Sequence, residues 1–274
     1  MIRRSGILLM PLRRITNCRN VEAIGRPFMK FESFPLYRLI DDESQDLIVL
    51  AEDVRGFFGE QEVHPPEVTF IRVHQIANAR RKVEDANLEV VNSQGVKIGD
   101  YCIGRVVRTG RHGLVENSPS NATYQFLGGV CEYSAAGEVW RHWASKVEGA
   151  MDEWLQWPSR YHETWLHVVQ NSWFASDKKA ASYGLDEVVY LDGVNICTKS
   201  SFYCALGEAV NGPRGYFGSN LDAVADCLSP EGTAPLSSIV WRNYQASRDH
   251  LGDDFMESIH SVMREFHVEV IARQ

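Results

Sequence analysis

The chain has 274 residues, of which 44% are hydrophobic, and its formal net charge is -8 at pH 7. This composition is typical of a globular chain that is long enough for one large or two ordinary domains, and it excludes a low-complexity protein. The charge is uneven: residues 186–274 contain 6 Lys and Arg against 13 Asp and Glu, so nearly all the excess negative charge lies there. An acidic domain of this kind is a poor partner for nucleic acid and a good partner for a basic protein.

Sequence motifs for catalysis, cofactors and metals were not found. The chain has no P-loop, no GxSxG nucleophile elbow, no HExxH motif and no dinucleotide fingerprint. The six cysteines form no CxxC pair or metal-ligand spacing, and we interpret them as reduced thiols of a cytoplasmic protein. Cys131 can be matched with a distant histidine, but so can any cysteine, and this makes no positive case for catalysis. We therefore expect no enzymatic activity, no cofactor and no bound metal.

The N-terminal residues 1–30 have a basic start and a short apolar run, which is the outline of a signal peptide. The run is short, contains Pro11, and ends in Arg13 and Arg14 rather than at a small-residue cleavage site. We therefore expect a disordered basic arm, and initiation at Met29 is the alternative. No segment approaches the ~20 apolar residues that a membrane span needs.

A β-rich domain is predicted over residues 31–134. Strands are expected at residues 36–40, 46–50, 68–73, 88–91, 96–107 and 124–133. A hairpin signal at residues 92–95 joins two of these strands. Residues 52–58 are predicted as a short helix. Gly128 and Gly129 indicate a bulge or a close backbone approach.

Residues 135–185 change to a helical and Trp-rich pattern. Trp165, Val169 and Trp173 recur at helical spacing. Tryptophans at such intervals form a core seam far more often than a ligand cage. We expect these helices to cover the β layer or to dock two domains, with residues 175–185 as the linker.

The final domain, residues 186–274, alternates short β runs with helical stretches. Such alternation predicts a parallel sheet with helices packed against it. The predicted fold class is therefore a two-domain chain of the α+β or α/β type. An N-terminal β-rich domain with a helical extension precedes a small three-stranded parallel sheet. Asp253 or Asp254 is expected to cap the last helix.

Residues 213–228 predict a glycine-aromatic loop that continues into a short helix. Ser219 or Asn220 can cap this helix by accepting from its first amides. Asp222 and Asp226 are four residues apart, so their carboxylates point off one face. The pattern predicts an anionic ridge beside an exposed ring. The alternative is an ordinary solvated helix face, whose first-turn acid is favoured by the helix dipole alone.

The segment Gly215-Tyr-Phe-Gly-Ser-Asn-Leu-Asp-Ala-Val-Ala-Asp-Cys-Leu resembles the signature of the barstar family, the intracellular inhibitors of barnase-type ribonucleases. The resemblance continues in the right order over about the final third of the chain. It implies that the loop and helix plug a ribonuclease active site, with the paired carboxylates in the place of substrate phosphates. The implied partner is a basic ribonuclease or nuclease toxin, and the implied role is immunity or antitoxin protection.

The resemblance also assigns partner contacts to individual positions. The implied contact residues are Tyr216, Phe217, Gly218, Asn220, Leu221, Asp222, Asp226, Val262 and Glu265. Tyr216 is then the ring that packs on the nuclease, and Gly218 holds the shape of the loop. The family has an aromatic residue where this chain has Ala225 and an acid where it has Ser219. The loss of a large ring changes the fit of the face, so the target need not be barnase itself.

Two other functions remain open. A scaffold or regulatory module can use the same acidic face on a non-nuclease protein. An RNA-associated regulator can act through the N-terminal domain, where Arg80, Arg81 and Lys82 form a basic run. Acidic residues are interleaved throughout that region, so nucleic-acid binding is the weakest of the three hypotheses.

Overall fold

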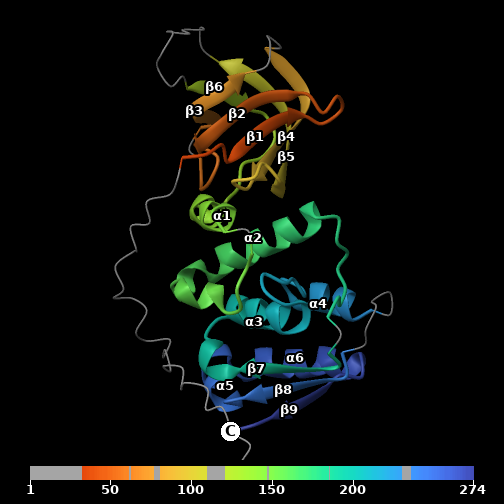
Figure 1. The fold of residues 1–274 in the computed structure, drawn as a ribbon. Coiled ribbons are helices and arrows are strands. Elements are labelled where there is room, and N and C mark those ends of the chain that lie inside the picture. Colours follow the sequence, from red (N-terminus) through yellow and green to blue (C-terminus); the bar gives the residue numbers. More distant parts are fainter. Residues whose placement is uncertain are drawn as a thin grey trace, which may run out of the picture.

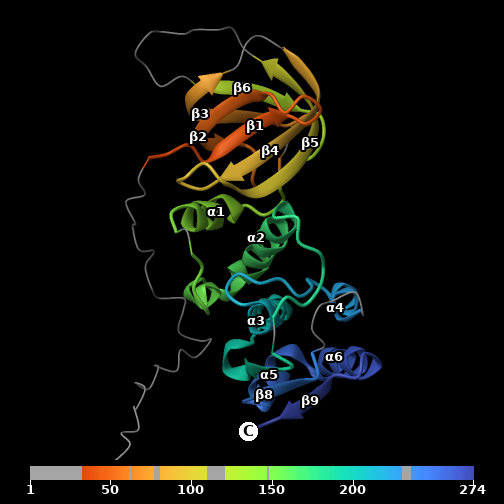
Figure 2. The same ribbon diagram turned by 45° about the vertical axis from the view of Figure 1, so that its right-hand side comes forward.

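The computed structural model describes residues 33–61, 63–76, 81–109, 121–146, 148–184, 186–229 and 236–274 (Figure 1). A β unit, a helical unit and a mixed α/β unit follow one another along the length of the molecule in Figures 1 and 2. No helix in this described part combines the length and the apolar character that crossing a membrane requires. The predicted basic arm at residues 1–30 lies outside the described residues.

Within the described residues, the N-terminal strands close into an antiparallel barrel. The strands are β1 (Tyr37–Asp41), β2 (Leu47–Arg55), β3 (Glu67–Ile76), β4 (Lys82–Val91), β5 (Lys97–Thr109) and β6 (Ala122–Phe126). Their order around the ring is β1-β2-β3-β6-β5-β4, so each strand is paired on both sides. Val68 and Phe70 of β3, and Leu88 and Val90 of β4, are fully buried, and they follow the two-residue period of strand side chains. These alternating side chains form the core of the barrel.

The predicted helix over residues 52–58 is wrong. Strand β2 continues through Arg55, which pairs with Thr69 of β3. The pairing of β2 with β3 is needed to close the ring, and this long-range contact outweighs the local sequence pattern.

The last barrel strand is shorter than predicted, because β6 ends at Phe126. The two glycines that follow explain the ending. A Cβ atom on Gly128 would lie 1.9 Å from the carbonyl oxygen of Ile103, so only a glycine allows this approach of two backbones. The predicted close backbone approach is confirmed at this position.

The helical unit lies between the barrel and the C-terminal unit. It comprises α1 (Ala136–Ala144), two short 3-10 turns (Glu153–Gln156 and Ser159–Tyr161) and α2 (His162–Ala175). Helix α2 packs on β5 on one side and on α3 (Lys199–Asn211) on the other (Figures 1 and 2). The rings of Trp143 and Trp165 are buried with their centroids 5.3 Å apart. The Trp-rich helices therefore cover the β layer and also dock the C-terminal unit, as predicted.

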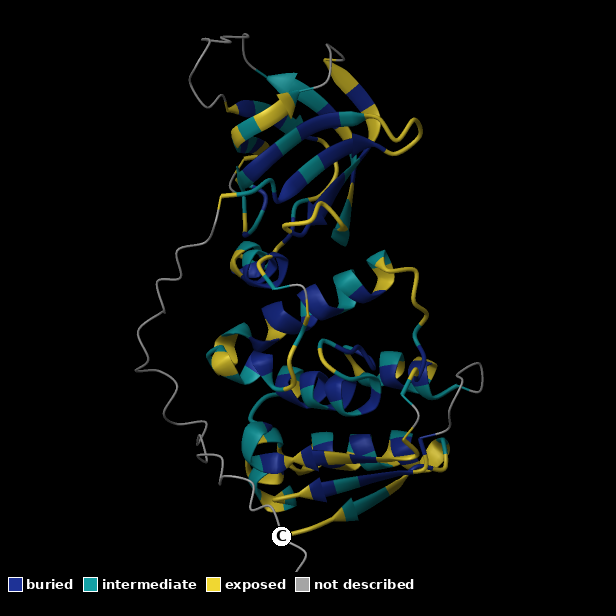
Figure 3. Cartoon of the chain, in the orientation of Figure 1, coloured by how far each residue is buried: buried dark blue, intermediate teal, exposed yellow. Residues whose placement is uncertain are grey.

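The C-terminal unit is a parallel sheet with helices packed against it. Its other elements are β7 (Val188–Asp192), α4 (Leu221–Leu228), β8 (Ser238–Arg242), α5 (Tyr244–Leu251), α6 (Asp253–Glu265) and β9 (Glu269–Ala272). The strand order is β7-β8-β9 and both pairings are parallel. Val189 and Leu191 of β7 are buried, whereas Val188 and Tyr190 are exposed, so the described residues leave one face of the sheet uncovered (Figure 3). The barrel and this sheet together confirm the predicted mixed fold class.

The last helix does not use the predicted cap. Gly252, with a positive φ of 81°, precedes α6, and no side-chain hydrogen bond caps that end. Asp253 instead forms an ion pair of 2.5 Å with Arg248 of α5. The reason is that Gly252 alone separates α5 from α6, so this glycine turns the chain and Asp253 bridges the two helices.

Candidate partner-binding site

The loop between α3 and α4 is held tightly against α3. A Cβ atom on Gly207 would lie 2.3 Å from the carbonyl oxygen of Gly215, so the loop backbone touches the helix. The Asn211 side chain donates to the carbonyl oxygens of Tyr216 at 2.6 Å and Ala181 at 3.1 Å. Its oxygen accepts from the backbone N–H of Tyr183 at 2.6 Å. One asparagine therefore joins the loop to the segment that follows α2.

Helix α4 begins as the sequence predicts. The side chain of Asn220 accepts from the backbone N–H of Ala223 at 2.8 Å, so Asn220 is the cap. Gly218 has a φ of +95°, and a Cβ atom there would lie 2.5 Å from the Val224 side chain. Gly218 is therefore needed both for its conformation and for the close packing of the loop on α4.

The two faces of α4 have opposite character. Val224 and Cys227 are buried against the core, whereas Asp222 and Asp226 are exposed. Burial, and then the charge of Asp226, raises the pKa of the Cys227 thiol to about 12. In the described part of the chain, neither carboxylate takes part in an ion pair with an Arg or Lys side chain. The predicted paired carboxylates thus lie together on the solvent side of a capped, rigid helix.

The predicted exposed ring beside this ridge is wrong. Tyr216 is 2% exposed and Phe217 is 1% exposed. The ring of Tyr216 packs edge-on against Phe174 of α2, with centroids 5.4 Å apart, and at 6.5 Å from Trp173. The physical reason is the helical unit: α2 supplies an aromatic cover that the sequence of the C-terminal domain alone does not contain.

The other predicted contact positions are divided between buried and exposed sites. Gly218 is buried, Leu221 is half-buried and Asn220 is exposed. On α6, which packs against α4, Val262 is half-buried against the core and Glu265 is exposed. The groups that reach solvent are therefore mainly the polar and acidic ones.

A buried polar cluster, which sequence analysis missed, fixes the loop against the helical unit. Arg214 pairs with Glu153 at 2.9 Å and lies over the Trp143 ring at 4.5 Å. Lys146 also reaches Glu153, at 3.2 Å. Burial raises the pKa of Glu153, but the charges of Arg214 and Lys146 outweigh it, so the pKa lies below its usual value. Arg214 and Glu153 are 61 residues apart, and no local pattern indicates that they meet.

Glu208 of α3 lies in the same interface, and the pKa of its carboxyl group is unusually high. It accepts from the backbone N–H of Asp152 at 2.8 Å and of Arg214 at 3.4 Å. Burial raises the pKa of Glu208 to about 7, although these two hydrogen bonds act in the opposite direction. The carboxyl group is therefore partly protonated at neutral pH.

The raised pKa of Glu208 predicts that stability falls as pH rises. The unfolded chain releases this proton near pH 4.5 and the folded chain near pH 7, so the folded state binds more protons between these values. The free energy of unfolding should fall by up to about 3 kcal/mol across this window because of this one group. Glu208→Gln mimics the protonated form, so the variant should lose that dependence.

Urea unfolding of both proteins at about pH 5 and about pH 8 measures this effect. The buried histidines titrate equally in both proteins, so they cancel in the comparison. An equal pH dependence in the two proteins would show that Glu208 titrates normally.

A cysteine and a histidine meet where α2 covers the barrel. The sulfur of Cys131 lies 3.4 Å from Nε2 of His167, which is also 3.1 Å from the Tyr101 hydroxyl. Burial raises the pKa of Cys131 and lowers the pKa of His167 to about 4. A neutral thiol and a neutral imidazole are the opposite of the ion pair that activates a nucleophilic cysteine. We interpret the pair as part of the packed interface.

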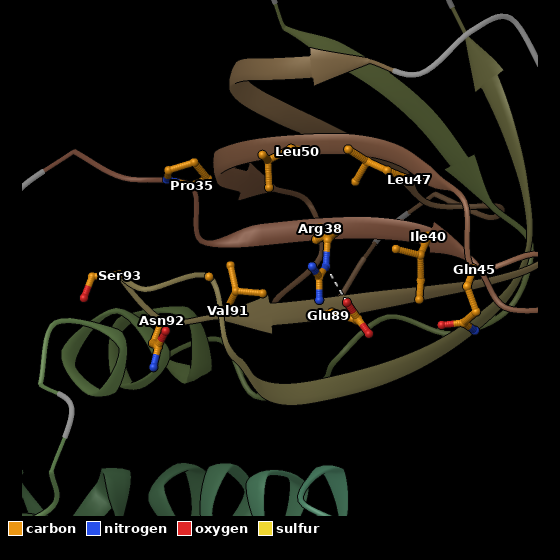
Figure 4. A pocket seen from close by; sticks show the side chains of 11 residues that line it. Pro35, Arg38, Ile40, Gln45, Leu47, Leu50, Glu89, Val91, Asn92 and Ser93 are labelled. Atoms are coloured by element: carbon orange, nitrogen blue, oxygen red, sulfur yellow. Dashed lines mark hydrogen bonds and ion pairs between the residues drawn. The ribbon is translucent and has the colours of Figure 1, made fainter.

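A groove of about 560 Å³ lies on the outside of the barrel over β1, β2 and β4 (Figure 4). Arg38 of β1 and Glu89 of β4 line this groove and form an ion pair of 2.6 Å (Figure 4). Lys97 is a further 3.9 Å from Glu89. Because their charges are paired with each other, the described residues that line the groove include no uncompensated charge that would select a charged ligand.

The basic side chains of the barrel are largely paired as well. Arg105 and Lys82 contact Glu84 at 2.6 and 2.5 Å, and Arg72 pairs with Glu52. Arg80, part of the predicted basic run, lies outside the described residues. This pairing reduces the positive field that RNA binding requires.

Comparison with known proteins supports the interpretation of the C-terminal unit. A search of curated proteins found no match. Residues 187–273 match the family model described as Barstar (barnase inhibitor). The matched residues include the parallel sheet, the glycine loop, α4 and α6. The C-terminal third of this chain is therefore a barstar domain, joined to an N-terminal barrel through a Trp-rich helical unit.

Proposed function

We propose that this protein is a stoichiometric, non-catalytic inhibitor of a barnase-type basic ribonuclease. It acts in the cytoplasm as an immunity or antitoxin protein. The observation that carries the proposal is the exposed pair Asp222 and Asp226 on a capped helix, within the segment that matches the barstar family.

The proposed mechanism is occlusion of the ribonuclease active site. An enzyme that cleaves RNA binds phosphates with Arg, Lys and His side chains, and two carboxylates on one helix face present the same charge. The capped start of α4 and the close packing of Gly218 hold these carboxylates in place before binding, so little conformational entropy is lost. Complementary charge also accelerates the encounter of the two proteins.

Titration of ribonuclease activity tests the proposal. Barnase and a panel of barnase-type ribonucleases are mixed with increasing amounts of the full chain, and cleavage of a fluorogenic RNA substrate is measured. We expect the activity of at least one enzyme to fall linearly to zero at one equivalent of the chain. Full activity of every enzyme in excess chain would contradict the proposal.

One observation favours a second candidate, a binding module for a basic protein that is not a nuclease. The ring of Tyr216 is covered, and Ala225 is a small, half-buried residue on the face that carries Asp222 and Asp226. The apolar part of the face therefore differs from that of the family. The same titration separates the two candidates, because a non-nuclease binder leaves the activity of the whole panel unchanged.

A further inference from the structure

Two aromatic rings are exposed at the end of the helical unit. Phe174, near the end of α2, is 44% exposed, and Tyr183, in the segment that follows, is 45% exposed. Tyr183 is held by two contacts. The hydroxyl of Tyr183 accepts from the backbone N–H of Lys179 at 2.9 Å, and its ring packs on Trp173 with centroids 5.4 Å apart. Phe174 and Tyr183 are called the aromatic surface below, and the sequence analysis did not identify them.

The aromatic surface is linked to α4 through one buried ring, that of Tyr216. Phe174 packs directly on Tyr216, with the ring centroids 5.4 Å apart. Tyr216 in turn lies in the loop that leads into α4, whose exposed face carries Asp222 and Asp226. In Figures 1 and 2 the end of α2, the segment descending from it and α4 lie on the same side of the molecule.

A partner that approaches Tyr216 from the side of α2 therefore meets Phe174. Phe174, together with Trp173, packs against the Tyr216 ring, and Phe174 itself is 44% exposed. The rings here also bind cations within the chain, because Nζ of Lys178 lies 4.1 Å from the centroid of the Trp173 ring. Aromatic faces attract Lys and Arg side chains in this way, and tyrosine and tryptophan are common at the energetic centres of interfaces.

We propose that Phe174 and Tyr183 are the aromatic half of a composite docking surface, with Asp222 and Asp226 as its acidic half, for a basic protein partner. This inference rests on the proposed function, because it takes the partner to be the same basic ribonuclease. The two halves come from different units of the chain. The helical unit is thus a direct contributor to recognition as well as a spacer.

A pair of opposite charges at position 174 tests this proposal. Phe174→Glu and Phe174→Lys remove the same packing on Tyr216, so any cost to folding is shared. Next to a basic partner, the Glu variant should bind at least about 10-fold more tightly than the Lys variant. The matched control is Tyr190→Glu and Tyr190→Lys, at a ring that is 57% exposed on the uncovered face of the sheet. The control pair should differ by less than about 2-fold.

The dissociation constants for the ribonuclease from the panel that the chain inhibits are measured by calorimetry. Equal affinities of the two position-174 variants would overturn the composite surface. Tighter binding by both variants than by the unmodified chain would also overturn it, because Phe174 would then be a cover that blocks the site. If the unmodified chain neither inhibits nor binds any enzyme of the panel, the proposed function fails and this inference fails with it. If Asp226→Ala abolishes inhibition and the two position-174 variants inhibit equally well, this inference fails and the proposed function stands.

Discussion

Asp226→Ala is expected to weaken binding of the inhibited ribonuclease by more than ~2 kcal/mol, which is a loss of affinity of about 30-fold or more. Asp226 is exposed in the free chain, so its removal leaves the fold with no unpaired buried group. In the complex, the proposal places this carboxylate against basic side chains in a site from which water is excluded. Loss of the carboxylate then leaves those basic groups buried and unpaired.

The matched control for this prediction is Asp249→Ala. Asp249 is an exposed acid on α5, and its carboxylate accepts a hydrogen bond from the side chain of Gln245. Its removal changes the net charge equally, so it reports the general effect of charge on binding. If Asp226→Ala and Asp249→Ala reduce the affinity by the same small factor, Asp226 belongs to the rim of the interface and the acidic face is not its centre.

Arg214→Ala is expected to destabilise the folded chain by about 3 kcal/mol or more. The side chain of Arg214 is 13% exposed and that of its partner Glu153 is 2% exposed. Without the guanidinium group, the buried carboxylate keeps the contact with Lys146 at 3.2 Å and a longer one, of 3.7 Å, with His142, whose pKa is lowered mainly by burial. The Trp143 ring also loses the group that covers it. Most of the cost is therefore that of a buried charge left poorly paired.

Urea unfolding measures this effect, and Arg248→Ala is the control. Arg248 forms its ion pair with Asp253 at the surface, where the two side chains are 47% and 74% exposed. An exposed pair of this kind contributes little to stability, because water screens both charges. A loss for Arg214→Ala that is no greater than the loss for Arg248→Ala would mean that the interface between the helical unit and the barstar domain does not depend on this cluster.

The sequence allowed good predictions where the signal is local. The cap at Asn220, the spacing of Asp222 and Asp226, and the alternation of strands and helices in the C-terminal unit depend on residues close together in the chain. Each has a physical reason that needs no knowledge of the rest of the molecule. These local features were enough to predict that Asp222 and Asp226 lie on one exposed face of α4.

The sequence failed where contacts join distant segments. The cover over Tyr216 comes from Phe174, 42 positions earlier, and nothing near either residue indicates that they meet. The same is true of Arg214 and Glu153. The strand at residues 52–55 was missed because its pairing with β3 is set by closure of the barrel. Helical periodicity predicted that the Trp-rich unit packs on a neighbouring unit, but it did not indicate that Phe174 would cover Tyr216.

The burial of Tyr216 changes how the family resemblance applies to this chain. Asp222 and Asp226 remain available to a partner, but the aromatic contact implied at Tyr216 is occupied within the molecule. The loop and α4 are also fixed to the helical unit through Asn211 and Arg214. We therefore expect the recognition surface to be a property of the docked units together.

In the proposed complex, the acidic face of α4 occupies the phosphate-binding site of a ribonuclease. The most direct measurement is the dissociation constant of the complex with increasing concentrations of a mononucleotide that binds the ribonuclease active site. We expect strict competition, with an apparent dissociation constant that rises linearly with the concentration of free nucleotide. A constant affinity, with nucleotide and chain bound to the enzyme at the same time, would contradict it.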